Sequence, residues 1–480
     1  AQPTETLTVS WCAGDESGAK LLPSFVVERI RKLFPQVEIQ REDGAYRCGL
    51  PAAALALAGQ RPGGALWRYF EMHGQGGTLE KMAAARAMGR GRLSPGAVRS
   101  LYGSTLAMSA SRLDQVKSCH FGYFMEYGLR AKPRQPAAFD APQIGTFLHY
   151  LLEHVTADVL KRGGFARVEE TELRELTAYY IRRYVEQELR NFQGRGARFK
   201  YLFARLRNTA WAVVEQVAEE MRHSDFVPLE FELSFGDGGT LPAVVVSEPD
   251  AQLRIGGKVD RVDGWVKDGK LYLRVVDYKS GRKSFDLASV RMGLDIQMLL
   301  YLFALQKEGA QHFGHEIEPA GVLYLPARDE ILSAERNIPP EKLRREREKQ
   351  LRRSGLLLSD PEVLQAMEHE SLQEPHFLPV RVGKDGSISG SIASAARLGK
   401  LGRYVDKLVR QIGREVRQGN IDADPCCHSE EDSYCQYCDW APACHFQDGR
   451  DGDHLRYILP VKPEEFWDEL EREDEEGGEK

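Results

Sequence analysis

The spacing of hydrophobic residues changes along the chain, and these changes mark out its parts. Residues 1–105 alternate short apolar runs with Gly and Pro, and helical stretches are predicted near 24–34 and 51–58. From residue 109 to about 223, apolar positions recur every three or four residues. This spacing predicts a series of helices, including a long one over 144–163.

The apolar period then shortens to about two. Residues 228–235, 253–262 and 271–279 alternate in polarity or are rich in β-branched side chains, which predicts three strands. The sequence KDGK at 267–270 predicts a tight hairpin between the last two. Helical spacing returns over 286–307, a strand follows at 320–326, and charged or amphipathic helices are predicted over 340–353 and 394–418. This order predicts an α/β core in which helices flank a mixed sheet.

Size and composition narrow the class of protein. A chain of 480 residues with 42% hydrophobic content can bury more than one core. No stretch reaches the roughly 18 apolar residues of a membrane helix, and the first residues lack an apolar leader, so we expect a cytoplasmic location. Eight cysteines are too few for a disulfide scaffold in a chain of this length.

The net charge of -6 is concentrated at the end of the chain. Residues 464–480 hold ten acidic and two basic side chains, so the rest of the chain carries +2. We expect residues 461–480 to form a solvated, disordered acidic tail, as such segments usually do. A mildly basic body is compatible with a nucleic-acid partner.

Two neighbouring predicted strands carry charged residues where they can meet. Asp260 lies on the strand 253–262, and Asp277 and Lys279 lie at the end of the strand 271–279. A tight hairpin holds these strands side by side, and residues two apart share a face, so all three can converge on one cation. Mg²⁺ binds through one or two carboxylates plus phosphate oxygens, and a nearby ammonium can stabilise charge that develops during phosphodiester hydrolysis. Asp-x-Lys alone is more typical of a solvated ion pair, so its surroundings decide its meaning.

Those surroundings resemble a known family. The segments GGKVDRVD, VVDYKSG and QMLLY are similar to the RecB-like branch of the PD-(D/E)xK nuclease superfamily. The resemblance implies that Asp260, Asp277 and Lys279 are catalytic, and that His149 joins the two aspartates at the metal.

Further positions follow from the same resemblance. It implies a motif on the next helix formed by Gln297 and Tyr301, and an acidic residue on the first strand, for which we favour Glu232 over Glu230. The plainer alternatives are a buried, hydrogen-bonded histidine at His149 and ordinary helix packing at Gln297 and Tyr301.

The cysteines suggest a second centre. Cys435, Cys438 and Cys444 are spaced closely enough to hold one metal centre, and Cys119 is the candidate for the fourth ligand. Spacing does not separate zinc from a [4Fe-4S] cluster. For zinc, the local rivals as fourth ligand are Cys426, Cys427, His428 and His445.

A resemblance to AddB-type nucleases, the B subunits of AddAB helicase-nucleases, favours iron. These proteins carry one cysteine before the nuclease domain and three after it, which implies a structural [4Fe-4S] cluster on the four cysteines Cys119, Cys435, Cys438 and Cys444. His120 departs from the family pattern, in which proline is expected at that position.

Candidate DNA contacts are less specific. Residues 195–207 interleave five basic side chains with aromatic ones, a combination that suits single-stranded nucleic acid. An amphipathic helix that packs its aromatic residues inward would have the same pattern, and the basic run at 342–353 can be a solvated helix. The sequence contains no Gly-x4-Gly-Lys-Ser/Thr, so we expect no P-loop ATP site.

Together the resemblances imply a division of the chain and a function. We expect residues 1–105 to be the remnant of a helicase-like domain and residues 106–460 to be the nuclease domain, so that the chain is the C-terminal portion of a B subunit. The implied activity is Mg²⁺-dependent exonuclease action on single-stranded or unwound DNA supplied by an ATP-driven helicase A subunit, during double-strand break repair. A free-standing single-strand exonuclease and a catalytically silent DNA-binding scaffold are the alternatives.

Overall fold

The computed structural model describes residues 9–12, 21–37, 39, 48–87, 89–133, 141–188, 197–248, 251–281, 283–328, 338–369, 372–429, 431–449 and 452–478. The chain divides into two compact units, Ala1–Gly89 and Arg90–Lys480. This division falls earlier than the boundary expected at residue 105.

The described part of the first unit is helical. It consists of α1 (Phe25–Leu33), α2 (Pro51–Gln60), α3 (Ala65–Phe70), the π-helical turn η2 (Glu71–Gln75) and α4 (Gly76–Ala87). The helices expected near 24–34 and 51–58 are confirmed: the Ser24 side chain caps α1, and Pro51 begins α2. A Cβ atom at Gly59 would lie 2.4 Å from Cε of Met82, so α2 and α4 approach closely there.

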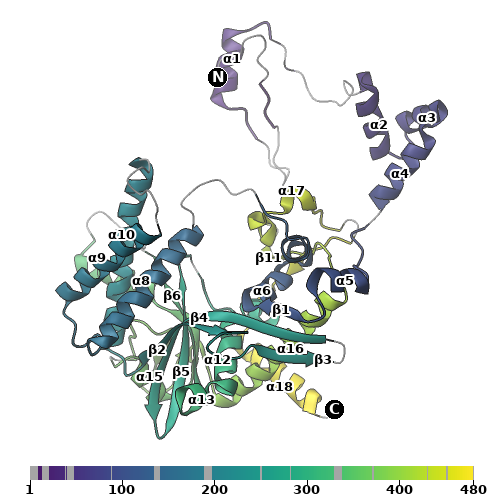
Figure 1. The fold of residues 1–480 in the computed structure, drawn as a ribbon. Helices are drawn as coiled ribbons and strands as arrows, with labels where there is room; N and C mark the ends of the chain where they lie inside the picture. The colour runs from purple at the N-terminus through teal and green to yellow at the C-terminus, as the bar shows by residue number, and fades with distance from the viewer. Residues whose placement is uncertain are drawn as a thin grey trace. The chain divides into compact units, whose positions relative to one another are not determined.

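The second unit is built on one mixed sheet (Figure 1). Its strand order is β1-β4-β5-β6-β7-β10, and β2 and β3 also pair with β4. Its strands are β1 (Leu106–Ser109), β2 (Val227–Phe235), β3 (Val244–Glu248), β4 (Ala251–Lys267), β5 (Lys270–Lys279), β6 (Glu316–Pro326), β7 (Ser354–Leu358) and β10 (Ile392–Ala393). The β4–β5 and β6–β7 pairs are antiparallel, and β5–β6 is parallel.

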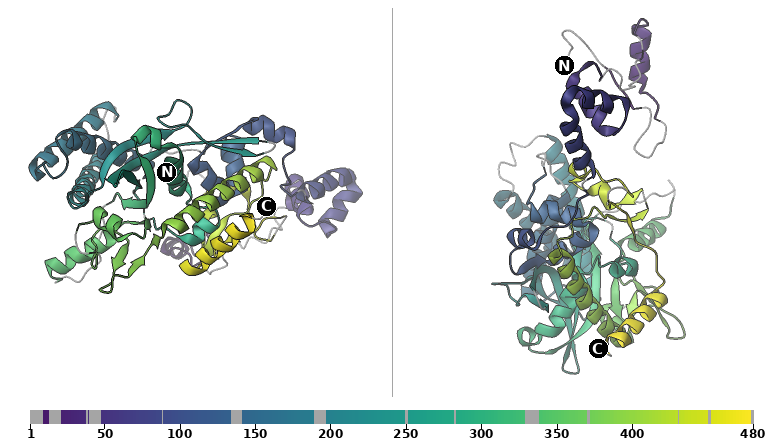
Figure 2. Two further views of the ribbon diagram at one scale, coloured as in Figure 1. Left: turned by 90° about the horizontal axis from the view of Figure 1, so that it is seen from below. Right: turned by 90° about the vertical axis from the view of Figure 1, so that its right-hand side faces the viewer.

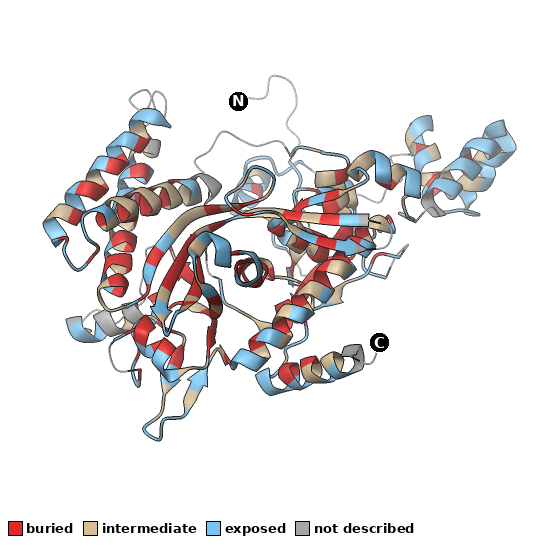
Figure 3. Cartoon of the chain, turned by 60° about the horizontal axis from the view of Figure 1, so that its bottom comes forward, coloured by how far each residue is buried: buried red, intermediate tan, exposed pale blue. Residues whose placement is uncertain are grey.

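Helices cover both faces of this sheet, and Figure 3 shows buried residues concentrated where sheet and helices meet. The layer on one face holds α8 (Ala141–Lys161), α9 (Glu170–Gln187) and α10 (Ala197–Arg222), and the other face is covered by α12 (Gln297–Glu308) and then α16 (Ala395–Arg417). The expected α/β core with a mixed sheet flanked by helices is confirmed. No helix in the described ranges is both long and apolar enough to span a membrane.

Shorter elements complete the second unit. The helices are α5 (Pro95–Tyr102), α6 (Ala110–Ser118), α7 (His120–Tyr123), η3 (Phe124–Gly128), α11 (Leu287–Arg291), α13 (Ala310–Phe313), α14 (Pro340–Leu351), α15 (Pro361–Met367), η5 (Tyr434–Tyr437), α17 (Ala441–Cys444) and α18 (Pro463–Gly478). The small strands are β8 (Val380–Val382), β9 (Ile388–Gly390), β11 (Cys426–Ser429), β12 (Asp432–Ser433) and β13 (Arg456–Tyr457).

The predicted hairpin at 267–270 is confirmed as the β4–β5 turn. Asp268 and Gly269 have φ of 51° and 78°, the left-handed pair that a two-residue turn between twisted strands requires. Strand β3 was not expected: it pairs with the first half of β4, whereas β2 pairs with the second half.

The continuous helix expected over 286–307 is wrong. The chain instead forms α11, breaks, and begins α12 at Gln297. Gly293 and Asp295 have φ of 81° and 58°, which interrupts right-handed helix. The break places Asp295 and Gln297 beside the site described below.

The expectation of a disordered acidic tail is also wrong for the described part of residues 461–480. Helix α18 buries Phe466, Trp467 and Leu470 on one face. Helix α18 lies beside α16 (Figure 2). Its acidic residues pair with basic residues of α16, through Arg403 with Asp474 at 2.6 Å and Lys407 with Glu473 at 2.7 Å. The apolar residues recur at helical spacing, so this segment has a face to bury.

Candidate active site

Strands β4 and β5 place Asp260 opposite Asp277. The last paired residues of their ladder are Arg261 and Val276, so Asp260 and Asp277 are the next opposite positions and share one face of the sheet. Here the side chain of Asp260 replaces the backbone partner: the Tyr278 N–H donates to Oδ2 of Asp260 at 2.8 Å. The two strands therefore present their carboxylates where regular pairing stops.

His149 and Glu232 complete a cluster with Asp260. One ligand atom from each of the three residues lies within 4.8 Å of the others. Nδ1 of His149 lies 3.5 Å from Oε1 of Glu232 and 3.5 Å from Oδ1 of Asp260. The opposite ring nitrogen, Nε2, contacts the carbonyl oxygen of Tyr278 at 3.3 Å, and a carbonyl only accepts, so Nε2 is the donor.

The structure distinguishes the two candidate acids on β2. Glu232 lies in the cluster, whereas Glu230 pairs with His312 at 2.9 Å. The backbone of Glu232 has φ of 51°, a conformation that non-glycine residues rarely adopt. Such strain persists only where the surrounding structure holds it, and it is common at functional sites.

Negative charge is in excess at this cluster. Burial and the negative charge of Asp277 raise the pKa of Asp260 to about 7. Burial lowers the pKa of His149, but the hydrogen bond with Glu232 and the charge of Asp260 outweigh it and leave that pKa raised. His149 and Lys258, whose Nζ is 2.9 Å from Glu232, lower the pKa of Glu232. An imidazole nitrogen and carboxylate oxygens are donors that fit a divalent cation.

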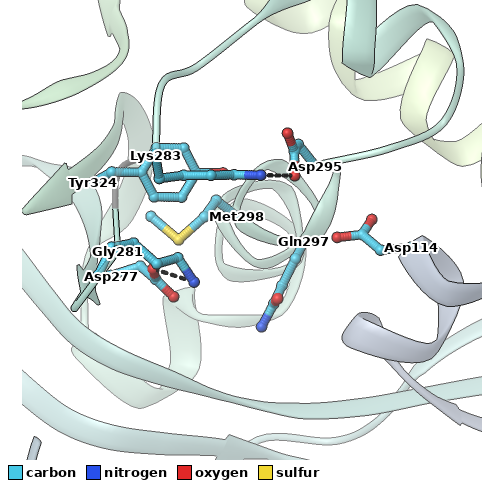
Figure 4. A pocket seen from close by; sticks show the side chains of 9 residues that line it. Asp114, Asp277, Gly281, Lys283, Asp295, Gln297, Met298 and Tyr324 are labelled. Carbon is cyan, nitrogen blue, oxygen red and sulfur yellow. Dashed lines mark hydrogen bonds and ion pairs between the residues drawn. The ribbon is translucent and has the colours of Figure 1, made fainter. Parts of the chain in front are cut away.

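A cavity of about 290 Å³ opens beside Asp277 (Figure 4). Lys279 contributes to its wall, with Nζ 2.7 Å from Oδ2 of Asp277 and 5.8 Å from the ring centroid of Tyr324. A second cavity, of about 460 Å³, is lined by His149, Glu153 and Glu232 among others. The cluster and the Asp277–Lys279 pair thus each border an open space.

Gln297 and Tyr301 lie at the start of α12 and have different surroundings. Gln297 lines the first cavity and donates from Nε2 to Oη of Tyr301 at 3.4 Å. Tyr301 is buried, stacks on Phe235 at 5.6 Å, and lies so close to β4 that a Cβ atom at Gly257 would come within 1.9 Å of its hydroxyl. Tyr301 therefore holds α12 against the strand that carries Asp260.

Sequence reasoning missed three charged residues in the first cavity. Asp114 of α6 points into it, and burial, then the charge of Asp295, raise the pKa of Asp114 to about 7 (Figure 4). Asp295 forms an ion pair with Lys283. No motif marks these positions, because Asp114 lies in a different helical segment and the left-handed backbone of Asp295 is not visible in sequence.

The opposite face of the same two strands carries a buried charge network. Its members are almost fully buried and belong to α10, β4, β5 and the residue before β7. The ion pairs are Arg261–Asp263 at 2.7 Å, Arg274–Asp263 at 2.9 Å, Arg274–Glu220 at 3.0 Å and Arg353–Glu220 at 2.7 Å. Arg261 also donates from Nη1 to the Tyr278 hydroxyl at 3.1 Å. This clamp joins β4 to β5 directly behind Asp260 and Asp277.

The cysteine-rich segment meets the end of α6. Cys119 is buried, and Cys435, Cys438 and Cys444 are partly buried. A Cβ atom at Gly122 would lie 3.4 Å from the Tyr434 ring and 3.7 Å from Cβ of Cys119, so Cys119 is close to the residue that precedes Cys435. Burial raises the pKa of the Cys119 thiol to about 12 and that of Cys435 to about 11.

The rivals for the fourth ligand have other contacts. The thiol of Cys426 donates to the carbonyl of Lys117 at 3.0 Å, and that of Cys427 to the carbonyl of Arg456 at 3.8 Å. His428 is exposed, and His445 adopts a left-handed conformation directly after Cys444. Cys119 lies next to Tyr434, and Cys427 lies opposite Ser433 in the β11–β12 pair.

His120, the departure from the family pattern, is a satisfied buried residue. Its Nδ1 lies 2.7 Å from Oδ2 of Asp424, and its Nε2 lies 3.3 Å from Oε2 of Glu415. The backbone N–H of His120 also donates to Asp424 at 2.9 Å. Histidine thus ties α7 to α16 and to the segment before β11.

Comparisons with known proteins agree with this architecture. The family model of the PD-(D/E)XK nuclease superfamily matches residues 107–445. The B subunit of the ATP-dependent helicase/deoxyribonuclease of Acetivibrio thermocellus is 31% identical, over 98% of this chain and 43% of its own length. Proteins of the same name from Clostridium acetobutylicum and Caldanaerobacter subterraneus are 30% and 28% identical, over 99% of this chain and 44% and 43% of their lengths. The chain spans less than half the length of these curated relatives.

Proposed function

Because the chain belongs to the PD-(D/E)XK nuclease superfamily, we propose that it is a divalent-metal-dependent deoxyribonuclease that acts on single-stranded or unwound DNA. The observation that carries this proposal is the convergence of His149 of α8, Glu232 of β2 and Asp260 of β4 within 4.8 Å, at the point where β4 and β5 bring Asp260 opposite Asp277. The excess of carboxylates there suits a cation and the phosphate that accompanies it.

The residues have distinct roles in this proposal. Asp260, Asp277 and His149 hold the cation, with Glu232 as a further ligand or as a partner that orients His149. When bound, Mg²⁺ supplies charge neutralisation at the phosphate and lowers the pKa of a water molecule. Lys279 is held by Asp277 at 2.7 Å and directs its ammonium toward the charge that develops on the phosphate.

Residues on α12 support this arrangement. Tyr301 fixes α12 against Gly257, and Gln297 places its amide group at the cavity wall. Gln297 can then donate a hydrogen bond to a phosphate oxygen or water, while Tyr301 acts as a positioning residue.

Cutting of end-labelled single-stranded DNA tests this function. We expect Mg²⁺-dependent cutting by the chain, loss of cutting in Asp277→Ala, and wild-type cutting in Asp468→Ala, a matched change at an exposed residue of α18. Equal cutting by the wild type and Asp277→Ala would contradict the site assignment. Binding without cutting by the wild type would favour the silent scaffold.

We further propose that the chain is the nuclease part of a helicase-nuclease B subunit, with residues 1–105 as a helicase-like remnant. The relatives are named as B subunits of ATP-dependent helicase/deoxyribonucleases, and this name and their greater length support the assignment. The partner would be an ATP-driven A subunit, and the reaction would be exonuclease processing of double-strand breaks in the cytoplasm. Affinity capture of the chain from its native host should recover an ATP-driven helicase, whereas a free-standing exonuclease would be recovered without a helicase partner.

For the cysteines we propose a structural [4Fe-4S] cluster on Cys119, Cys435, Cys438 and Cys444. The position of Cys119 beside Tyr434, and the backbone hydrogen bonds of Cys426 and Cys427, support this ligand set. Iron and sulfide analysis after anaerobic purification should find a cluster that Cys435→Ala loses and Cys48→Ala, a change at an exposed cysteine, keeps. Bound zinc without iron would contradict the proposal.

A further inference from the structure

A groove between α9 and α10 collects positive charge far in sequence from the catalytic strands. The two helices face each other with residues spaced three or four apart, from Arg174 to Glu186 on α9 and from Lys200 to Trp211 on α10. Ala178 and Ala204 occupy the middle of these faces, and their small side chains leave a cavity of about 810 Å³ open between the helices. Facing helices normally close such a space with larger apolar residues.

The charge of the groove differs from that of the chain. Its lining includes four cationic side chains, Arg174, Arg182, Lys200 and Arg207, against one acid, Glu186, whereas the whole chain carries -6. Within the described ranges, Arg182 and Arg207 are exposed and form no hydrogen bond or ion pair. Two free guanidinium groups on opposite walls suit a ligand that carries several phosphates.

The groove also offers flat surfaces. The guanidinium group of Arg174 lies 4.6 Å from the ring centroid of Trp211, and Trp211 remains partly exposed at one end. Phe203 and Ile181 are buried and form apolar floor. Nucleic-acid bases stack on aromatic rings and on arginine planes, and cations track the backbone.

The layer that forms the groove also carries the catalytic histidine. Helix α8, which bears His149, packs against both α9 and α10, and Figure 1 shows the three helices side by side. A strand held between α9 and α10 is therefore held by the same helical layer that borders the cutting site.

We propose that the α9–α10 groove binds single-stranded DNA outside the cutting site, with Arg182 and Arg207 on phosphates and the Arg174–Trp211 pair stacked against a base. The inference deepens the proposed function and rests on it for the identity of the ligand. It differs from the basic run anticipated at 195–207: residues 195–196 lie outside the described ranges, and half of the binding groups come from α9.

Binding of a fluorescein-labelled oligothymidylate in EDTA, where no cutting occurs, tests the proposal. We expect Arg182→Gln/Arg207→Gln to bind roughly tenfold more weakly at low salt and to reduce the slope of log K against log salt by about 1.4, the value for two lost phosphate contacts on a single strand. The matched control is Arg183→Gln/Arg205→Gln, which removes the same charge from exposed neighbours outside the groove lining and should bind as the wild type does.

The stacking contact has its own pair of variants. Trp211→Ala should weaken oligothymidylate binding by at least about fivefold, and Trp211→Phe, which keeps an aromatic plane, should restore most of it. Equal binding by both variants and the wild type would show that no DNA base stacks on Trp211, and would contradict the proposal.

Other results of the binding experiment would contradict the assignment of the groove to single-stranded DNA. Equal losses in the groove and control pairs, absence of binding by the wild type, or equal groove dependence for blunt duplex DNA would overturn the single-strand assignment. Normal oligothymidylate binding by the groove pair together with lost capture of a helicase partner would identify a protein interface instead. Because binding is measured without metal, a wild type that binds through the groove yet fails to cut with Mg²⁺ would refute the proposed nuclease function and leave the groove standing.

Discussion

One face of the β4–β5 hairpin carries Asp260 and, opposite it, Asp277, which lines a cavity. On the other face, one residue along each strand, Arg261 and Tyr278 are buried. Both faces carry many charged side chains, but the surroundings of the carboxylates differ. On the buried face the carboxylates of Glu220 and Asp263 are paired with arginine, and the pKa of Glu220 is lowered to about 2 despite its burial, through the charges of Arg353 and Arg274. On the cavity face the pKa of Asp260 is raised to about 7 by burial and by Asp277.

The difference teaches how to separate structural charge from functional charge. Carboxylates that the protein itself neutralises, such as Glu220 and Asp263, stabilise the fold in place. Carboxylates that the protein crowds together, such as Asp260 beside the Asp277–Lys279 ion pair, are completed by a ligand that binds. A buried pair of like charges that costs stability is expected at functional sites.

The largest effect should come from the cavity face. Asp260→Ala should reduce Mg²⁺-dependent DNA cutting by about a thousandfold or more, because several kcal/mol of transition-state stabilisation depend on the cation. The free energy of unfolding in EDTA should change little, because the removed repulsion from Asp277 offsets the lost hydrogen bond from the Tyr278 N–H. A large loss of stability would place Asp260 with the structural charges.

A substitution on the buried face should instead reduce stability and leave DNA cutting intact. Glu220→Gln should lower the free energy of unfolding by about 3–5 kcal/mol, because Arg274 and Arg353 would keep buried charges without their partner. Urea denaturation measures this loss. Cutting at a temperature where the variant remains folded should be close to that of the wild type, and lost cutting by a fully folded variant would contradict the division between the faces.

The two faces should respond to pH in opposite directions. Asp260 has a raised pKa when folded, so the metal-free protein should lose stability as pH rises from about 4, where the unfolded carboxyl titrates, to about 7. Glu220 has a lowered pKa, so its stabilisation is present above 4.5 and is lost as pH falls toward about 2.

Denaturation midpoints measured across this pH range in EDTA check both signs. Asp260→Asn should reduce the loss on the neutral side, to which Asp114 also contributes because its pKa is raised to about 7 too, and should leave the acid side unchanged. A neutral-side slope equal to that of the wild type in Asp260→Asn would assign the titration to another group.

The smallest effect should come from the contact between the faces. Tyr278→Phe removes the hydrogen bond from Arg261 and should cost about 1–3 kcal/mol of stability, because a buried donor loses its acceptor. The strands should also be held less firmly behind Asp260 and Asp277, so the Mg²⁺ concentration for half-maximal cutting should rise while the maximal rate changes little. An unchanged Mg²⁺ requirement would make the tyrosine purely structural.

The sequence predicted the parts of this comparison that depend on local pattern. Alternating polarity and the KDGK turn locate the hairpin, and its two-residue period places Asp260, Asp277 and Lys279 on one face. The pairing on the buried face was not predictable, because Glu220 and Arg353 come from distant segments whose periodicity shows burial but not partners.

Two backbone features were not predicted from the sequence, for a similar reason. The left-handed conformations of Glu232 and Asp295 arise from tertiary packing, and the second of these breaks a helix that the apolar spacing made continuous. In α18 the many acidic residues led to a prediction of disorder, although Phe466, Trp467 and Leu470 form an apolar helix face. The prediction of disorder followed the acidic composition, whereas the helical spacing of the apolar residues indicated the helix that is observed.

Cation binding tests the central claim most directly, because it asks what completes the cavity face without requiring DNA to be cut. The free Mn²⁺ signal in electron paramagnetic resonance, measured during titration of the protein, reports how many ions are bound. We predict a binding site in the wild type and in Asp468→Ala that is lost in Asp260→Ala. Undiminished Mn²⁺ binding by Asp260→Ala would contradict the assignment of these carboxylates to a metal centre.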